Sequence, residues 1–144
     1  MKIYLDTSAL VKLYVDEEGS ATVREALGPL TLAVTSAIAY LEARAALARR
    51  RREGGLAVAA YRGTVRALEA DWQQYMVVQV HEALIRDAAR LAEARRLRAY
   101  DALHLASARL IRRRLGPPIV FACWDRELER VARAEGFRVL AWAH

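Results

Sequence analysis

Cysteine is almost absent from the 144-residue sequence, because Cys123 is the only one. A disulfide-stabilised scaffold is therefore excluded. Long apolar runs are missing too: Asp6 interrupts the first run, and the longest uncharged stretch, residues 26–41, is shorter than the roughly 20 residues that span a bilayer. No repeat, linker or low-complexity tract is present. With 55% hydrophobic residues, the sequence predicts one soluble cytoplasmic domain over residues 1–144, with no membrane segment.

Lysine is nearly as scarce, and this affects how the basic charge is interpreted. Only Lys2 and Lys12 are lysines among 23 basic residues, which against 17 acidic residues give a formal net charge of +6. A strong arginine bias also arises from a GC-rich coding background, so the charge alone does not identify a polyanionic partner. Clustered arginines hold phosphates well, however, and such a partner is compatible with this sequence.

Short β-rich segments alternate with longer helical patterns along the chain. Strands are predicted at residues 2–5, 31–34, 76–80, 119–122 and 137–141. Helices are predicted at residues 9–15, 19–27, 37–53, 56–71, 82–97, 101–115 and 125–135. This order predicts an α/β fold with a mostly parallel central sheet of about five short strands and helices on both faces. In such sheets the functional groups collect beyond the carboxyl ends of the strands.

Four carboxylates occupy places that this fold would bring near the carboxyl edge of the sheet. Asp6 directly follows the first predicted strand, and Asp125 follows the fourth. Glu42 lies inside the helix after the second strand, with small apolar residues one turn away, and Asp101 begins a later helix. Ionised carboxylates are rarely buried without a partner. Glu42 in particular therefore indicates a site.

Each acid also has a purely structural explanation. Asp6 and Asp125 are placed to cap the helices that follow them, and Asp101 is a first-turn acid favoured by the helix dipole. Glu42 has no such explanation unless it faces solvent. Together, converging like charges require a cation or a bound proton. Oxygen ligands without His or Cys select Mg²⁺ or Mn²⁺ over zinc, and an open site of this kind handles phosphates.

Histidine contributes no metal-binding pattern, because the three histidines show no ligand spacing. His104 lies three residues after Asp101, which leaves a contact with the acids open. We expect it to be a half-buried helix residue.

The carboxylates lie in sequence blocks that resemble those of PIN-domain ribonucleases of the VapC toxin type. The blocks are DTSALVKLY at residues 6–14, SAIAYLEARAA at residues 36–46, YDALHLA at residues 100–106 and DREL at residues 125–128. One block alone would be weak, whereas four in order cover essentially the whole chain.

The resemblance implies a PIN-like three-layer sandwich and an Mg²⁺- or Mn²⁺-dependent endoribonuclease. Its implied catalytic acids are Asp6, Glu42, Asp101 and Asp125, of which Asp6, Asp101 and Asp125 are assigned to the metal. Asp6 and Asp125, which leave rigid strands, are the expected direct ligands. Whether Glu42 or Asp101 binds the metal through water or orients the nucleophile is left open. An RNA substrate, a cognate antitoxin protein and a homodimer are implied as well.

Two neighbouring positions modify this site. Ser8 is implied as a polar supporting residue, since the block that carries Asp6 carries a hydroxyl there. Cys123 stands two places before Asp125, where the family often has Thr or Ser. Cysteine is a poorer hydrogen-bond partner, which leaves the support of Asp125 open.

Candidate RNA contacts lie close to two of the acids. Arg95, Arg96 and Arg98 lead directly to Asp101, and phosphate contacts of this kind position RNA without specifying its sequence. Trp124 is placed to stack on a base. The alternatives are arginines that favour a helix C-terminus and a tryptophan packed at the strand end.

Other functions remain open at this point. A PIN nuclease of RNA processing without toxicity would share the same acids, and a catalytically silent module that binds RNA or a protein partner would differ only in activity. A phosphoaspartyl protein is a further alternative. Against it, Ser8 occupies the place of the second acid in the Asp-x-Asp of the phosphatases, and no lysine lies late enough for a receiver domain.

Overall fold

The central feature of the computed structural model, which describes residues 1–140, is a five-stranded sheet. Its strand order is β3-β2-β1-β4-β5, and all four pairings between neighbouring strands are parallel. The strands are β1 (Lys2–Leu5), β2 (Leu32–Ser36), β3 (Met76–Val78), β4 (Val120–Ala122) and β5 (Arg138–Val139). The predicted α/β fold is confirmed, with a sheet that is parallel throughout the described residues.

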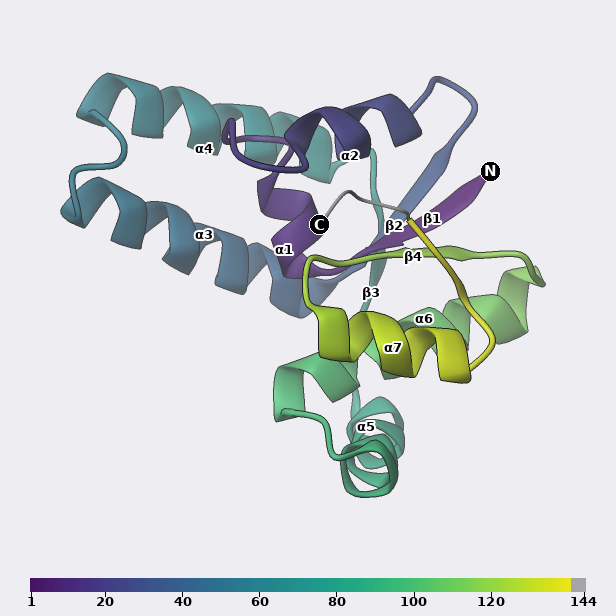
Figure 1. Ribbon diagram of the computed structural model, residues 1–144. Coiled ribbons are helices and arrows are strands. Elements are labelled where there is room, and N and C mark those ends of the chain that lie inside the picture. The colour runs from purple at the N-terminus through teal and green to yellow at the C-terminus, as the bar shows by residue number, and fades with distance from the viewer. Residues whose placement is uncertain (141–144) are drawn as a thin grey trace.

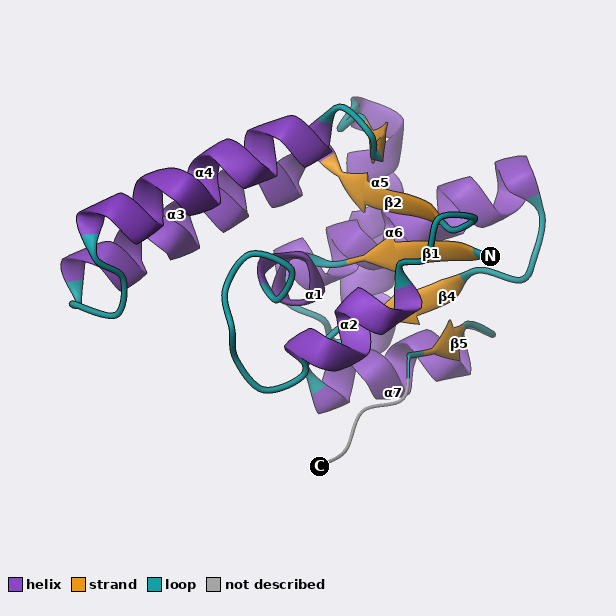
Figure 2. Cartoon of the chain, turned by 90° about the horizontal axis from the view of Figure 1, so that it is seen from above, coloured by secondary structure: helices purple, strands orange, loops and turns teal. Residues whose placement is uncertain are grey.

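Helices cover both faces of this sheet and complete three layers (Figure 1). On one face lie α1 (Thr7–Val11), α2 (Ser20–Ala26), α3 (Ala37–Arg52) and α4 (Val58–Trp72). On the other lie α5 (Glu82–Arg95), α6 (Ala99–Leu115) and α7 (Arg126–Ala134). Helices α3 and α4 run side by side as a hairpin that extends well beyond the sheet (Figure 2). No helix within residues 1–140 combines the length and the apolar character needed to cross a membrane.

The middle strand explains why the molecule has two cores. Ile3 and Leu5 of β1 are fully buried against α1–α4, whereas Tyr4 between them is fully buried against α5–α7. On that second side the Tyr4 ring stacks on Phe121, with 5.4 Å between ring centroids. A central strand of a parallel sheet is covered on both faces, so successive side chains serve opposite cores. The chain leaves this rigid strand at Asp6.

The predicted boundaries differ from the observed ones mostly by one or two residues. The largest difference concerns the first helix, predicted at residues 9–15 and observed as Thr7–Val11. It begins earlier because Asp6, rather than a later hydroxyl residue, is its N-cap. The last strand, predicted at residues 137–141, is limited to Arg138–Val139, and Ala141 lies outside the described residues.

Candidate active site

Asp6 anchors the site at the carboxyl end of the central strand. Its Oδ1 accepts hydrogen bonds from the Ala9 backbone N–H at 2.9 Å and from the Ser8 hydroxyl at 2.7 Å. Only 5% of the residue is exposed. Burial raises the pKa of this carboxyl, and His104, Ser8 and the Ala9 amide offset only part of that effect. Asp6 is thus a cap, as its position predicted, but one whose negative charge costs free energy unless a cation approaches.

Ser8 joins the ends of two neighbouring strands. While its hydroxyl donates to Asp6, the same oxygen accepts the backbone N–H of Trp124 at 2.9 Å. The Asp6 backbone N–H in turn donates to the carbonyl oxygen of Ala122, the last residue of β4, at 3.1 Å. The segment after β4, which carries Asp125, is therefore fastened beside Asp6.

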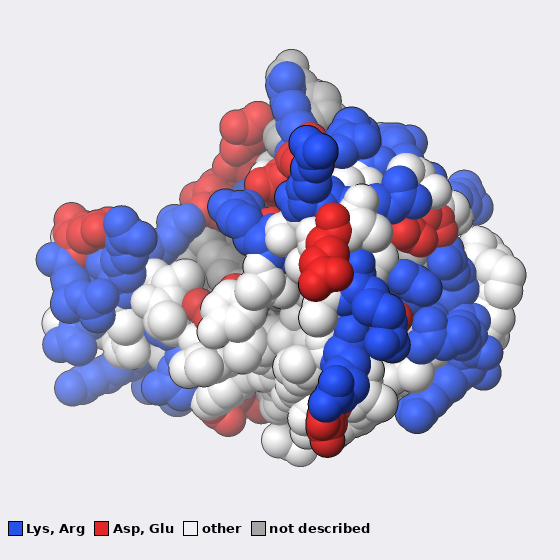
Figure 3. Space-filling model, turned by 90° about the horizontal axis from the view of Figure 1, so that it is seen from below, with Lys and Arg blue, Asp and Glu red and all other residues white. Residues whose placement is uncertain are grey.

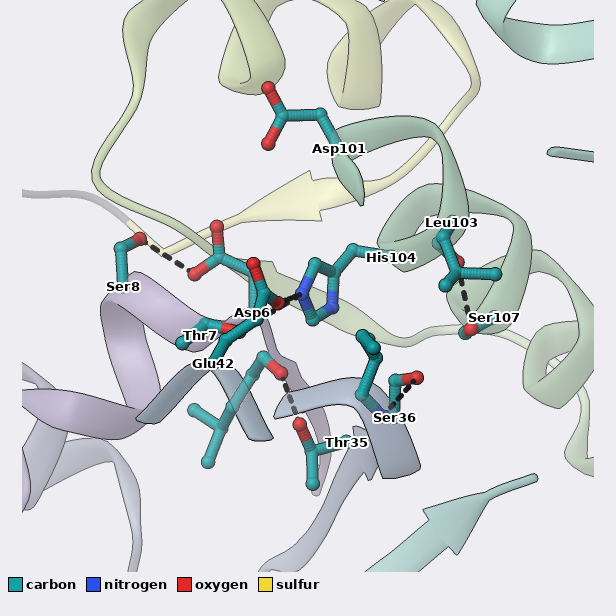
Figure 4. A network of polar contacts seen from close by, with 12 residues as sticks. Asp6, Thr7, Ser8, Thr35, Ser36, Glu42, Asp101, Leu103, His104 and Ser107 are labelled. Atoms are coloured by element: carbon teal, nitrogen blue, oxygen red, sulfur yellow. Dashed lines mark hydrogen bonds and ion pairs between the residues drawn. The ribbon is translucent and has the colours of Figure 1, made fainter. Parts of the chain in front are cut away.

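Glu42 enters the site from α3, whose N-terminus is capped by the Ser36 side chain. Its Oε1 accepts from the Thr7 hydroxyl at 2.5 Å and lies 2.9 Å from Nε2 of His104 (Figure 4). Partial burial pushes the pKa of Glu42 upward, but the bonds from His104 and Thr7 outweigh it and the pKa is lowered. The carboxylate therefore faces the interior of the site, as its apolar helix neighbours suggested, and it is ionised at neutral pH.

His104 is almost completely enclosed, with 3% of its side chain exposed. Its Nδ1 lies 2.8 Å from the hydroxyl of Tyr4, and its Nε2 lies 3.1 Å from Oγ1 of Thr7 and faces Glu42. The expectation of a half-buried helix residue was wrong. The Tyr4 side chain, which alternation along β1 directs to the α5–α7 face, contacts the ring from within that core and fixes it in the site.

Asp101 and Asp125 form a second, more open group of acids. Asp125 Oδ1 caps α7 through the Leu128 N–H at 2.9 Å, and its Oδ2 accepts from Nη2 of Arg98 at 3.1 Å. Arg98 also donates through Nε to Oδ2 of Asp101 at 3.0 Å. The side chains of Asp101, Asp125 and Arg98 are 21%, 37% and 77% exposed. A guanidinium thus bridges two of the predicted acids where solvent reaches them.

The structure brings the four predicted acids to one edge of the sheet, but as two groups. Asp101 lies close enough to raise the pKa of Asp6, whereas its side chain stands apart from His104 (Figure 4). Within residues 1–140, no three His, Cys, Asp or Glu side chains are arranged as a ready-made metal site. The donors nevertheless fit a hard cation: they are carboxylate oxygens, one is buried with a raised pKa, and two already share a cationic side chain.

Cys123 supports the backbone beside this site. Its thiol is buried and donates a long hydrogen bond to the backbone carbonyl of Asp125, with 3.7 Å between sulfur and oxygen. Burial raises the pKa of the thiol, so it stays protonated. Cys123 therefore steadies the turn that carries Asp125 and leaves the Asp125 carboxylate to other partners.

The candidate RNA contacts are placed differently from one another. Arg98 reaches the acids, whereas Arg95 is paired with Glu135 at 3.0 Å. Arg96 ends α5 in a left-handed conformation, with φ of 57°, and no contact joins it to the four acids among the described residues. Trp124 borders the site, with its half-buried ring lying under the Lys12 ammonium at 4.9 Å from the ring centroid. Of the three arginines, only Arg98 lies at the site.

Arginine side chains are widespread on the face formed by α5, α6 and α7. Figure 3 shows many basic side chains on this face, with acidic ones among them and a broad uncharged area beside them. The arginines on these three helices are Arg86, Arg90, Arg95, Arg109, Arg112, Arg113, Arg114, Arg126, Arg130 and Arg133. Such a surface attracts a polyanion without specifying its sequence.

Sequence reasoning did not assign Thr7 and Tyr4 to the site, and it undervalued His104. A signal was present for two of them. Thr7 directly follows a strand-end acid, and His104 lies one helical turn after Asp101, on the side of α6 that packs against the sheet. Tyr4 gave none, because an aromatic residue inside a strand is ordinarily core.

Comparison with known proteins places these residues in a family. The sequence model of the PIN domain family matches residues 3–134 of this chain. Ribonuclease VapC45 and Ribonuclease VapC49, from two strains of Mycobacterium tuberculosis, are each 37% identical to this chain over 137 residues, which cover 95% of this chain and 93% of each relative.

Solved structures show the same fold at low sequence identity. VapBC-1 from nontypeable Haemophilus influenzae has 18% identity and a TM-score of 0.63, covering 99% of this chain and 98% of that chain. FitAcB from Neisseria gonorrhoeae has 17% identity and a TM-score of 0.67, with 96% of both chains covered. VapC20 from Mycobacterium tuberculosis, described as a sarcin-ricin loop cleaving toxin, has 20% identity and a TM-score of 0.64, covering 98% and 99%.

Proposed function

The chain belongs to the PIN domain family, and from that premise we propose that it is an endoribonuclease, the toxin of a toxin–antitoxin pair, that hydrolyses RNA phosphodiester bonds with Mg²⁺ or Mn²⁺. The relatives named as ribonucleases support the activity, since they match this chain over nearly its whole length. A chain of a toxin–antitoxin complex from Klebsiella pneumoniae shares the fold, with a TM-score of 0.58 at 18% identity over 85% of this chain and 86% of that chain, which supports an antitoxin partner.

One observation of the site carries the proposal. Buried Asp6 and solvent-accessible Asp101 and Asp125 meet at the carboxyl edge of the sheet, where burial, and to a smaller extent Asp101, raises the pKa of Asp6. Helix capping accounts for Oδ1 of Asp6 and of Asp125, while Oδ2 of Asp125 is held only by the exposed Arg98. Clustered carboxylates of this kind are tolerated when a cation joins them.

We assign the metal to Asp6, Asp101 and Asp125, whose carboxylate oxygens are the donors that Mg²⁺ and Mn²⁺ prefer. The ion, when bound, neutralises negative charge on the phosphate and lowers the pKa of a coordinated water. Ser8 supports this group by holding Asp6 in its orientation.

The remaining side chains of the site act on the water or contact the RNA. Glu42, ionised at neutral pH and held through Oε1, accepts at Oε2 a proton of the water that attacks phosphorus, while the bridging P–O bond breaks and the leaving oxygen takes a proton from solvent. Arg98, exposed and able to leave Asp101 and Asp125, contacts the phosphate. Trp124, at the border of the site, stacks on a base. Arg95 and Arg96, farther along, would contact only a longer RNA.

The assembly and location are part of the proposal. We place the protein in the cytoplasm, where RNA and a cognate antitoxin would both be available. A homodimer is proposed with it, because paired subunits would present two sites on one basic surface.

Cleavage of a mixed RNA pool tests this function. The wild-type protein is incubated with Mg²⁺, with Mn²⁺ and with EDTA, beside Asp6→Asn, which keeps the shape of the side chain and removes its charge. Asp16→Asn is the matched control, since the Asp16 side chain is 93% exposed and outside the site. We expect metal-dependent cleavage by wild type and Asp16→Asn, and none by Asp6→Asn.

The other outcomes separate the alternatives. A folded wild-type protein that leaves every RNA intact with either metal would favour a silent binding module. Cleavage by Asp6→Asn at the wild-type rate would show that the site is misassigned. Cleavage without growth inhibition on expression would favour an RNA-processing nuclease over a toxin.

A further inference from the structure

We propose that His104 and Thr7 are positioning residues that hold one oxygen of Glu42, so that the other oxygen faces the reacting water, with Tyr4 holding the ring of His104 from the opposite side. This inference rests on the proposed function, since it assigns Glu42 to the chemistry. It adds residues from β1, α1 and α6 to the acids themselves.

The geometry around Glu42 is asymmetric. Oε1 lies 2.5 Å from the Thr7 hydroxyl and 2.9 Å from His104 Nε2, and those two donors lie 3.1 Å apart. Among residues 1–140, no hydrogen bond involves Oε2 of Glu42. A carboxylate held at one oxygen by two donors keeps its plane fixed and presents the other oxygen in one direction.

The placement of protons follows from the partners. A carboxylate only accepts hydrogen bonds, so Nε2 of His104 must carry the proton that Glu42 receives. In the neutral ring the Tyr4 hydroxyl, 2.8 Å from Nδ1, then serves as donor to that nitrogen. The contacts thus fix the orientation of the ring and require a proton on Nε2.

Burial makes this arrangement persistent. The Tyr4 residue is fully buried and the His104 side chain is 3% exposed, whereas 25% of the Glu42 side chain is exposed. The ring and the phenol are therefore locked in the core, and the carboxylate they hold reaches the solvent side. A surface Glu on a helix would instead sample several rotamers.

A double-mutant cycle tests the coupling. Thr7→Val keeps the side-chain shape and removes the hydroxyl, His104→Leu removes both ring nitrogens, and each is measured alone and combined with Glu42→Gln. We expect each single variant to lower kcat on RNA by about tenfold to a hundredfold and to change KM by less than about twofold. The reason is that the Glu42 carboxylate is displaced while the contacts with the substrate remain. In the Glu42→Gln background, neither change should lower kcat further. Equal losses in both backgrounds would overturn the proposal.

Two further variants serve as controls. Thr7→Ser retains a hydroxyl and should recover most of the wild-type kcat. His81→Ser changes a histidine at the N-cap of α5, outside the site, to another capping residue, and should leave kcat unchanged. A Thr7→Ser variant as slow as Thr7→Val would also overturn the proposal.

A measurement independent of activity guards against variants that fail to fold. Long-range ¹H–¹⁵N correlation spectra of the wild-type protein report which ring nitrogen of His104 carries a proton. We expect it on Nε2, and a proton on Nδ1 with none on Nε2 would overturn the assignment. If wild type cleaves RNA and Asp6→Asn does not, while Thr7→Val and His104→Leu cleave normally, only this inference fails. A wild-type protein without cleavage defeats the proposed function instead.

Discussion

The site has a buried half and an open half, and they are held in place by different forces. Asp6 is 5% exposed and Glu42 contacts the enclosed His104, so the hydrogen bonds there lie out of water. Asp101 and Asp125 are joined by Arg98, whose side chain is 77% exposed. Hydrogen bonds in a low-dielectric interior fix geometry, whereas exposed ion pairs contribute little and are readily exchanged. The fold therefore preorganises one half and leaves the other free to adapt to cation and substrate.

Electrostatics divide the buried half further. Burial raises the pKa of Asp6 above its ordinary value, while at Glu42 the donors outweigh a smaller burial effect and lower the pKa. A buried acid with a raised pKa, such as Asp6, is stabilised most by a bound cation. An acid that is held ionised by donors, such as Glu42, is ready to accept a proton. The two carboxylates are thereby suited to different tasks.

The largest expected loss of stability comes from adding a side chain at Gly19, against Trp124. Gly19 has a φ of +89°, and a Cβ there would lie 2.3 Å from Cζ2 of Trp124, the residue before Asp125. Gly19→Ala should lower the free energy of unfolding by about 1–3 kcal/mol through overpacking and about 1–2 kcal/mol through the left-handed backbone. Urea denaturation measures the loss.

Gly63→Ala is the matched control for that change. Gly63 lies inside α4, and nothing stands within 4 Å of the added Cβ. The free energy of unfolding of this variant should be about 0.5–1 kcal/mol higher than that of wild type, because Ala favours a helix over Gly by that amount. If Gly19→Ala were as stable as wild type, the packing of Trp124 would not join the two halves.

Ser8→Ala should be next in size, because it removes the link between the strand ends. The Trp124 N–H would lose its acceptor, which costs about 1–3 kcal/mol for a buried donor, and Asp6 would lose one donor. Thermal and urea unfolding check the value. Thr31→Val, which removes a part-buried hydroxyl bond to the carbonyl oxygen of Ala26 away from the site, should cost only about 0.5–1.5 kcal/mol. Equal losses for the two would contradict a linking role for Ser8.

The pH dependence of stability should differ in sign between Asp6 and Glu42. The folded pKa of Asp6 is raised, so its contribution to stability is present at low pH and is lost as pH rises above the ordinary value of 3.8. Asp6→Asn should therefore melt above wild type at pH 7 without metal, with the difference shrinking toward pH 4. Melting curves across pH 4–8 measure it.

Glu42→Gln serves as the counterpart. The folded pKa of Glu42 is lowered, so its contribution is present above the ordinary value of 4.5 and is lost as pH falls through the folded pKa. This variant should melt below wild type at pH 7, and the deficit should close on acidification. The same sign for both variants would remove the electrostatic distinction between the two carboxylates.

Arg98→Gln should have the smallest effect on stability and would sharpen the contrast with the buried half. An exposed ion pair contributes less than about 1 kcal/mol, and salt screens it, so urea denaturation at low and high salt should show little change. The KM for RNA should rise severalfold because a phosphate contact is lost. A loss of stability as large as that of Ser8→Ala would mean that the open half is as rigid as the buried one.

The order of elements was predictable because periodicity and turn residues are local signals. The five strands and the sheet type follow from them, and so does the position of Asp6 and Asp125 just past strand ends. The start of α1 was missed because three capping residues stand in succession, and only the observed bond from the Ala9 N–H identifies Asp6 as the cap. Local signals do not rank competing caps.

The partners of the acids were harder to predict. Arg98 precedes Asp101 and was expected near the site, but its bridge to Asp125 crosses from α6 to the start of α7. Arg95 looked equivalent and instead pairs with Glu135. Arg95 ends α5 and Arg98 caps α6, so a turn separates them, and which side chain meets the site depends on how the two helices pack.

By itself, the sequence determined the class of fold and the placing of Asp6 and Asp125 at one edge, because strand ends in a parallel sheet share that edge, and it predicted Glu42 and Asp101 as their companions through the family resemblance. Only the tertiary structure decided that Glu42 meets Thr7 and His104, residues 35 and 62 positions away along the chain. It also decided that the acids divide into a buried half and an open half. Burial and long-range hydrogen bonds are properties of packed surfaces, and no local run of residues specifies which surfaces meet.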